Sequence, residues 1–261
     1  MRHSIFAVVL TALMVCAAVQ AAPGAGALAL LCAENNSPGC FGAQANLQAT
    51  NKFTSVDAFD VTTSTPALST ISGYGAVLAW TDNVPADPTG LGNLLASYYN
   101  LGGKHLVVST YGFSNPWAIS GTVMTGSFAA LTNLGTNGTV SGSLVAVVPS
   151  DPIFTGTTLS SVTYFENLNY AHPGLAPGAT LLATDGAGVN MIARSANGVI
   201  DFNVYPGSES ATNAAFYNLL ATALTSGGSV VSVPALTPVA VVLLIAGILL
   251  LAAFQLRRRT A

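Results

Sequence analysis

The stretch from Tyr74 to Gly112 constrains the fold more than any other part of the chain. Two short apolar runs, Ala76–Trp80 and Leu106–Val108, flank a segment in which leucines and a tyrosine recur at helical spacing. Continuous apolar runs of this length are typical of strands buried on both faces of a parallel sheet. Gly102 and Gly103 supply a stop for the intervening helix. The stretch therefore predicts two parallel strands joined through a helix by a right-handed crossover.

The rest of the domain shows the same alternation of apolar runs and helical patterns less regularly. We expect further strands at Ala27–Leu31, Ser55–Val61, Leu144–Val148, Val162–Phe165, Thr180–Ala183, Asn190–Arg194 and Val199–Val204. The last three follow one another so closely that they are typical of antiparallel strands at a sheet edge. We expect helices at Phe41–Asn51 and Ser210–Leu224, and a short one at Phe128–Asn133. This pattern predicts an α/β domain.

Charge is scarce along the whole chain. Of 261 residues only 7% are charged, and all ten acidic residues lie in the region that contains just Lys52, Lys104 and Arg194 as basic residues. Such a domain has no basic face to neutralise phosphates, so we expect no nucleic-acid partner. The sequence also lacks a phosphate loop, a dinucleotide fingerprint and a zinc motif, and we expect neither a cofactor nor a metal.

The N-terminus has the pattern of a secretory signal peptide. Arg2 precedes a short apolar run, Ile5–Val15, which is followed by small residues. We expect signal peptidase to cut after Ala21, or after Ala22, so that residues 1–21 form the signal peptide. The alternatives are a retained N-terminal anchor, for which the run is short, and lipidation at Cys16, for which the preceding valine is unsuitable.

The C-terminus predicts one membrane-spanning helix. Val239–Phe254 is wholly apolar, and with its flanks it reaches the ~20 residues that cross a hydrocarbon core of ~30 Å. It also lacks the polar stripe of a helix packed on a globular core. The basic residues that follow, Arg257, Arg258 and Arg259, should stay in the cytoplasm and leave the preceding domain outside. We therefore expect an α/β domain at 22–226, a linker at 227–238, a transmembrane helix at 239–256 and a cytoplasmic tail at 257–261.

This end of the chain resembles the Pro-Thr-Leu-type sorting signals of Gram-negative bacteria, which are related to exosortase substrates. Those signals combine a short Pro-containing motif, one membrane helix and a basic tail. The corresponding motif here is Val233, Pro234, Ala235, Leu236 and Thr237, with Ala235 in place of the usual Thr. The resemblance implies processing by an exosortase-type enzyme. The alternative is a plain single-pass anchor that is never cut.

Two cysteines, Cys32 and Cys40, remain once the signal peptide is removed. In an oxidising compartment such a pair favours one disulfide. The alternative is a catalytic thiol, although neither cysteine lies on a strand-to-helix elbow beside a plausible base. The pair is too small for a structural zinc site.

Several segments carry a family resemblance: Tyr74–Asp82, Gly92–Tyr98, Gly102–Val108, Asp151–Gly156 and Gly198–Pro206. They resemble the class I glutamine amidotransferase-like superfamily, especially its ThuA-like, trehalose-utilisation-type branch. The resemblance implies a flavodoxin-like, mostly parallel sheet flanked by helices. The family's cysteine on a Gly-x-Cys-x-Gly elbow is missing, because this region reads Ser109–Phe113 without a cysteine, and His172 lacks a glutamate two positions on. A thiolate relay cannot form, so we do not expect glutamine hydrolysis.

Ligands of open α/β sheets gather beyond the carboxyl ends of the strands, near the switch in strand order. This rule points to Glu34 and Asp82, and His172 could approach them from the loop after the strand expected at Val162–Phe165. These three are the candidate catalytic residues. The candidate ligand-binding residues are Asn35, Asn83, Tyr111 and Ser114. Such side chains can support acid–base chemistry or bind a sugar. Each catalytic candidate also has a structural explanation: a loop carboxylate bonded to backbone amides for Glu34, a turn cap for Asp82 and a surface turn for His172.

We therefore expect an exported cell-envelope protein with a non-catalytic amidotransferase-like domain that has a binding or structural role. It would sit in the inner membrane with a periplasmic domain, or pass on to the cell surface or the medium after processing. The alternative is a ThuA-like enzyme acting on a carbohydrate through Glu34, Asp82 and His172. That alternative needs the three side chains within about 8 Å of each other around one pocket.

Overall fold

The computed structural model describes residues 26–34, 38–140, 142–162, 170–207 and 214–226. The expected signal peptide, linker, sorting motif, transmembrane helix and basic tail lie outside these ranges, as does Asn35. Within the described ranges, the helices are too short or too polar to cross a membrane.

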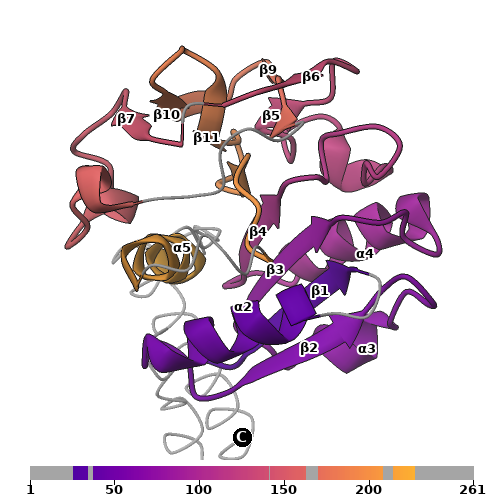
Figure 1. Ribbon diagram of the computed structural model, residues 1–261. Helices are drawn as coiled ribbons and strands as arrows, with labels where there is room; N and C mark the ends of the chain where they lie inside the picture. Colours follow the sequence, from indigo (N-terminus) through magenta and orange to yellow (C-terminus); the bar gives the residue numbers. More distant parts are fainter. Residues whose placement is uncertain (1–25, 35–37, 141, 163–169, 208–213, 227–261) are drawn as a thin grey trace, which may run out of the picture. The chain divides into compact units, whose positions relative to one another are not determined.

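An eight-stranded sheet forms the centre of the domain (Figure 1). Its strands, in spatial order, are β2 (Val56–Asp60), β1 (Leu28–Ala33), β3 (Ala76–Thr81), β4 (His105–Ser109), β12 (Ile200–Phe202), β11 (Asn190–Arg194), β10 (Thr180–Asp185) and β7 (Leu144–Ala146). The pairs from β2 to β12 are parallel, and the pairs from β12 to β7 are antiparallel. The sheet is therefore mostly parallel, and its first five strands follow the flavodoxin-like order 2-1-3-4-5.

Short elements and four helices complete the described part of the domain. The helices are α2 (Pro38–Ala49), α3 (Leu68–Ile71), α4 (Pro88–Tyr99) and α5 (Ala214–Ser226), and the 3₁₀ turns are η1 (Thr122–Met124), η2 (Pro152–Phe154) and η3 (Leu159–Ser161). Two small ribbons pair β5 (Leu131–Thr132) with β9 (Gly174–Leu175) and β6 (Asn137–Gly138) with β8 (Tyr170–Ala171).

Alternation along the buried strands divides the core into two layers. Leu28, Leu30 and Cys32 of β1 join the cluster that contains α2 and α5, whereas Ala29 and Leu31 join the cluster that contains α3 and α4. Successive side chains of a strand point to opposite faces of the sheet. A strand covered by helices on both faces must therefore be apolar throughout, which is why β1 reads as an unbroken apolar run.

The predicted strand–helix–strand unit is present as β3, α4 and β4, with β3 and β4 parallel and adjacent. The residues at the start of helix α4 explain why the helix begins there. Asp87 accepts a hydrogen bond from the Gly90 backbone N–H at 2.8 Å, and Pro88 occupies the first turn. Both features are typical of helix starts.

Two expectations are wrong in this part of the chain. The segment Phe128–Asn133 contains strand β5 instead of a short helix, because the backbone N–H groups of Ala130 and Leu131 donate to the Asp201 carboxylate on β12. Strands β10, β11 and β12 pair antiparallel as expected, but they do not form the edge: β12 lies beside β4, and β7 is the edge strand beyond β10. Most of the expected strand Val162–Phe165 lies outside the described residues.

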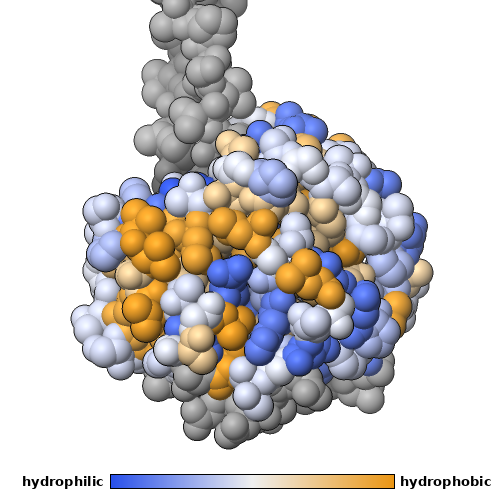
Figure 2. Space-filling view, turned by 90° about the horizontal axis from the view of Figure 1, so that it is seen from above, coloured by the Kyte–Doolittle hydropathy of each residue, from blue (hydrophilic) through white to orange (hydrophobic). Residues whose placement is uncertain are grey.

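Figure 2 looks onto the side of the domain that carries β6, β7 and β9 at the top of Figure 1. Hydrophobic and hydrophilic side chains lie there in adjacent patches. The large hydrophobic residues exposed in or close to these strands are Leu134, Val145, Val147 and Leu175.

Candidate functional site

The strand order reverses between β1 and β3, and open α/β sheets bind ligands at the carboxyl ends of the strands beside such a switch point. The register pairs Cys32 with Trp80 and Ala33 with Thr81. Glu34 and Asp82 are the next residues on the two strands. The Asp82 backbone N–H donates to the Ala33 carbonyl at 2.8 Å, which fixes the start of the second loop against the first. The fold thus brings the two acids predicted from sequence to the same edge.

Glu34 is a buried carboxyl group with several hydrogen-bond donors. The Trp80 indole Nε1 donates to its Oε1 at 2.5 Å, and the Tyr205 hydroxyl donates to the same atom at 2.8 Å. The backbone N–H of Cys40 also donates to the carboxylate. Burial raises the pKa of Glu34 above its ordinary value, and the nearby Asp82 charge adds to the rise, while the three hydrogen bonds oppose it. The rise in pKa caused by desolvation is therefore larger than the lowering caused by the hydrogen bonds.

Two glycines leave room for this carboxyl group. A Cβ atom on Gly39 would overlap with Glu34 Oε2 and would lie 2.5 Å from the Gly207 carbonyl oxygen. A Cβ atom on Gly207 would overlap with Glu34 Oε1 and would lie 2.9 Å from the Tyr205 hydroxyl. Any side chain at either position would displace the carboxyl group. The space around Glu34 is therefore fitted to it on both sides.

Tyr205 connects the two acids. Its hydroxyl lies 2.8 Å from Glu34 Oε1 and 3.5 Å from Asp82 Oδ2. A phenol has one proton to donate, so the shorter contact to Glu34 is the stronger hydrogen bond. Burial and the two neighbouring carboxylates raise the pKa of Tyr205 above its ordinary value. Asp82 is exposed as a residue, but desolvation of its carboxyl group still raises its pKa, against a lowering by Tyr205.

A cluster of aromatic rings adjoins Tyr205. The ring of Tyr111 lies 5.7 Å from that of Tyr205, 5.3 Å from that of Trp117 and 5.8 Å from that of Tyr170, measured between centroids. Tyr111 and Tyr170 are buried, and Trp117 is half-buried. Burial, and then the Asp82 charge, raises the pKa of Tyr111 to about 12, so its hydroxyl stays protonated at neutral pH.

Two other polar candidates, Ser114 and Asn83, have structural partners, and so does Ser109 at the position of the family's elbow. Ser114 is buried and shares a 2.7 Å hydrogen bond with the Asn137 side chain. The Asn83 backbone N–H donates to the Ala33 carbonyl at 2.9 Å. Ser109, which ends β4, donates to the carbonyls of Phe202 and Val204. Its hydroxyl is directed at backbone oxygens, whereas a hydrolytic nucleophile needs a neighbouring base.

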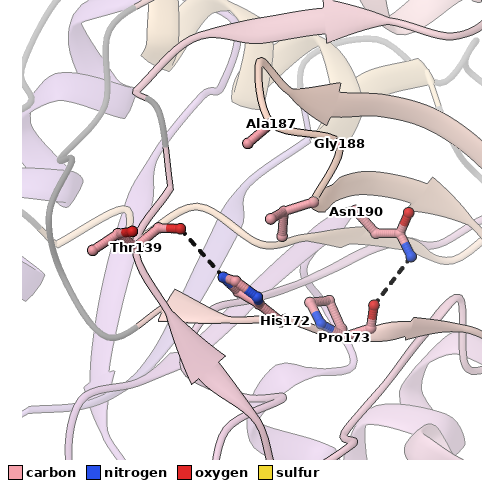
Figure 3. Close-up of a pocket in the computed structure, with 7 residues that line it drawn as sticks. Thr139, His172, Pro173, Ala187, Gly188 and Asn190 are labelled. Atoms are coloured by element: carbon pink, nitrogen blue, oxygen red, sulfur yellow. Dashed lines mark hydrogen bonds between the residues drawn. The ribbon is translucent and has the colours of Figure 1, made fainter.

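His172 lies in a separate pocket of about 390 Å³ (Figure 3). The residues that line this pocket are Thr139, His172, Pro173, Ala187, Gly188, Val189 and Asn190. A ring nitrogen of His172 lies 3.2 Å from the Thr139 carbonyl, and Asn190 Nδ2 donates to the Pro173 carbonyl at 3.0 Å. Neither Glu34 nor Asp82 lines the pocket. The described residues thus bring the two acids together and place the histidine among other partners.

Cys32 and Cys40 form a disulfide with a Cα–Cα distance of 6.1 Å. Both residues are buried, at the end of β1 and in the first turn of α2. The predicted pairing is present, and the two sulfur atoms are engaged with each other. Elsewhere in the described ranges, His, Cys, Asp and Glu side chains do not gather in a group of three that could hold a metal.

Sequence reasoning missed Trp80, Tyr205 and Trp117. Tyr205 follows β12 at the carboxyl edge, so the rule that selected Glu34 and Asp82 could have selected it as well. Trp80 is part of an apolar run, where an indole is expected to serve packing. Its Nε1 nevertheless makes a hydrogen bond that a buried tryptophan usually requires.

Comparison with known proteins adds information at the level of the fold. The sequence matches no family model and no curated protein. Among solved structures, the chain is similar to a ThuA-like protein from Bacteroides uniformis at 11% identity and a TM-score of 0.53, over 78% of this chain and 94% of that one. It is also similar to the cytoplasmic protein STM3548 from Salmonella typhimurium at 11% identity and a TM-score of 0.51, over 78% and 99% of the two chains. The domain therefore has a ThuA-like fold.

Proposed function

We propose that the domain binds a neutral, polyhydroxylated ligand of the sugar class at the carboxyl edge of β1 and β3, and does not convert it. The observation that carries the proposal is the meeting of Glu34, Asp82 and Tyr205 at one point of this edge. Carboxylate oxygens accept hydrogen bonds from hydroxyl groups. The half-buried rings of Tyr205 and Trp117 can offer flat apolar surface to the ring of a sugar.

The bonding of Glu34 favours binding over catalysis. A general base must be able to approach the proton that it abstracts. The Glu34 carboxylate already accepts hydrogen bonds from Trp80, Tyr205 and the Cys40 backbone, and it is only 5% exposed. A carboxylate held in this way acts as a fixed acceptor that orients Tyr205. Asp82, which is exposed, is the acid that a ligand reaches first.

Calorimetric titration of the full-length protein with trehalose, maltose and cellobiose tests this proposal. We expect one of the three sugars to bind, and we expect Asp82→Ala and Trp117→Ala to weaken its binding about 5- to 30-fold, the equivalent of ~1–2 kcal/mol for a lost hydrogen bond or aromatic contact. The matched control is Asn190→Ala in the His172 pocket, which should leave the affinity unchanged. The proposal fails if none of the sugars binds, or if the control variant loses as much affinity as Asp82→Ala.

A second candidate function is acid–base catalysis on a carbohydrate. It is favoured by the raised pKa values of Glu34 and Asp82, because paired carboxyl groups with shifted pKa values are common in catalytic sites. Such an enzyme would use the two acids with Tyr205, since His172 lines another pocket. Mass spectrometry of trehalose incubated with the protein separates the two functions. A product that disappears in the Asp82→Asn variant would establish the enzyme and reject non-catalytic binding.

We also propose that the domain works outside the cytoplasm, after removal of residues 1–21 and with residues 239–256 as its membrane anchor. Apolar runs at both ends of the sequence and the basic residues Arg257–Arg259 support this proposal. The disulfide is consistent with it, since such bonds persist in oxidising compartments. Cell fractionation with mass spectrometry of the mature termini is the test. A mature protein that keeps its arginine tail would reject exosortase-type cleavage near Pro234.

A further inference from the structure

The disulfide lies directly beside the carboxyl group of the candidate site. Glu34 follows Cys32 by two residues, and the backbone N–H of Cys40 donates to the Glu34 carboxylate. The bridge therefore connects the strand that leads to Glu34 with the helical turn that binds its side chain.

Glu34 is held from two sides. On the sheet side, Trp80 of β3 and Tyr205 beyond β12 donate to Oε1. On the helix side, the Cys40 N–H donates and the backbone of Gly39 lies against Oε2. The helix-side contacts hold only while the start of α2 stays against the end of β1. The bridged sulfur atoms join these two elements with a Cα–Cα distance of 6.1 Å.

The rest of α2 has attachments that do not depend on the bridge. Gln44 Nε2 donates to the Val56 carbonyl of β2 at 2.6 Å, and Ala43 and Leu47 are completely buried in the core. Loss of the bridge should therefore loosen the first turn of the helix and leave the helix itself in place.

We propose that the Cys32–Cys40 bridge positions the Glu34 carboxyl group, so that the site keeps its buried acid only in the oxidised protein. A dithiol reductant would transfer two electrons to the S–S bond, which with two protons becomes two thiols, while the reductant becomes a disulfide. The first turn of α2 would then separate from β1 and water would reach Glu34. Because burial is the main cause of its raised pKa, that pKa should fall towards the ordinary value.

This inference depends on the proposed function for its biological meaning, but it can be tested without a ligand. The chain contains three glutamates, Glu34, Glu166 and Glu209, so glutamate labelled with ¹³C at the carboxyl carbon gives few NMR signals. The Glu34→Gln variant assigns one of them. Titration of the full-length protein would compare the oxidised form, the form reduced with dithiothreitol and the Cys32→Ser/Cys40→Ser variant, with far-UV circular dichroism recorded throughout.

We expect the Glu34 midpoint to fall towards the ordinary glutamate value in both bridge-free forms, because the burial that raises it would be lost. Reoxidation should restore it, and the circular dichroism should stay folded. An unchanged midpoint in a folded, bridge-free protein overturns the proposal. Global unfolding on reduction overturns it too, because the bridge would then hold the whole fold instead of one carboxyl group. Failure of sugar binding would leave these readings unaffected.

Discussion

Asp201 gives the most quantitative prediction, through replacement by asparagine. Its carboxyl group is completely buried, and its Oδ2 accepts hydrogen bonds from the backbone N–H groups of Ala130 at 2.8 Å and Leu131 at 2.7 Å. Burial raises the pKa of Asp201 to about 7, against lowering by the two donors. Both N–H groups donate to the same carboxylate oxygen, and the side-chain amide oxygen of asparagine can accept these two hydrogen bonds in its place. The substitution therefore removes the charge and keeps the hydrogen bonds.

The sign of the effect follows from the raised pKa. The folded state binds a proton that the unfolded state releases near pH 3.9, so this group contributes stability at low pH that is lost as the pH rises through about 7. A rise of about three pKa units corresponds to ~4 kcal/mol at ~1.4 kcal/mol per unit. As the pH rises from 4 to 8, the free energy of unfolding of Asp201→Asn should therefore increase by up to ~4 kcal/mol relative to that of the natural chain. For a domain of this size, this corresponds to a Tm difference on the order of 10 °C.

Thermal unfolding of both proteins across this pH range, followed by circular dichroism, measures the difference. The Asp87→Asn variant is a suitable control, because its carboxylate is an exposed helix cap. If the Tm difference between Asp201→Asn and the natural chain stays constant from pH 4 to pH 8, Asp201 does not carry the proton that this reasoning assigns to it.

Two further substitutions test the fitted space around Glu34 and the ion pair between Arg194 and Asp151. Gly39→Ala should cost about 1–3 kcal/mol because its Cβ would displace the buried Glu34 carboxyl group, whereas Gly42→Ala in the same helix meets nothing within 4 Å and should be neutral or stabilise by up to ~1 kcal/mol. Equal effects of the two alanines in urea unfolding would contradict the fitted space around Glu34. Arg194→Met should cost about 1–3 kcal/mol, because it removes a two-pronged ion pair at 2.7 and 2.8 Å and leaves buried Asp151 without it. A loss below ~0.5 kcal/mol would mean that Asp151 is satisfied by the Ile153 backbone N–H alone, which donates to its Oδ1 at 3.1 Å.

The sequence was most informative where local pattern and burial agree. Strands β1, β3 and β4 lie between helices on both faces, so nearly every residue is apolar and the strands stand out. The β5 segment was predicted incorrectly because a side chain from β12, distant in sequence, captures its backbone N–H groups. No periodicity within residues 128–133 can report on that contact.

The residues of the candidate site also divide into those marked by a local sequence pattern and those placed by contacts between residues distant in sequence. Glu34 and Asp82 were found because each follows a recognisable strand, and a general rule connects strand ends to ligand sites. Their partners are set by distant contacts: Tyr205 lies 171 residues from Glu34 in sequence and Trp80 lies 46. His172 was grouped with the acids because it follows the strand expected at Val162–Phe165. Its position depends instead on the β6–β8 ribbon, whose short strands have no clear sequence pattern.

The central claim is that a sugar binds where Tyr205 joins Glu34 to Asp82. The most direct measurement is the carboxyl ¹³C signal of Glu34 in the oxidised full-length protein, recorded during titration with trehalose, maltose and cellobiose. One of these sugars should shift this signal in a saturable manner, and Asp82→Ala should weaken the response. Saturable binding that leaves the Glu34 signal unchanged but moves the ring signals of His172 would contradict it.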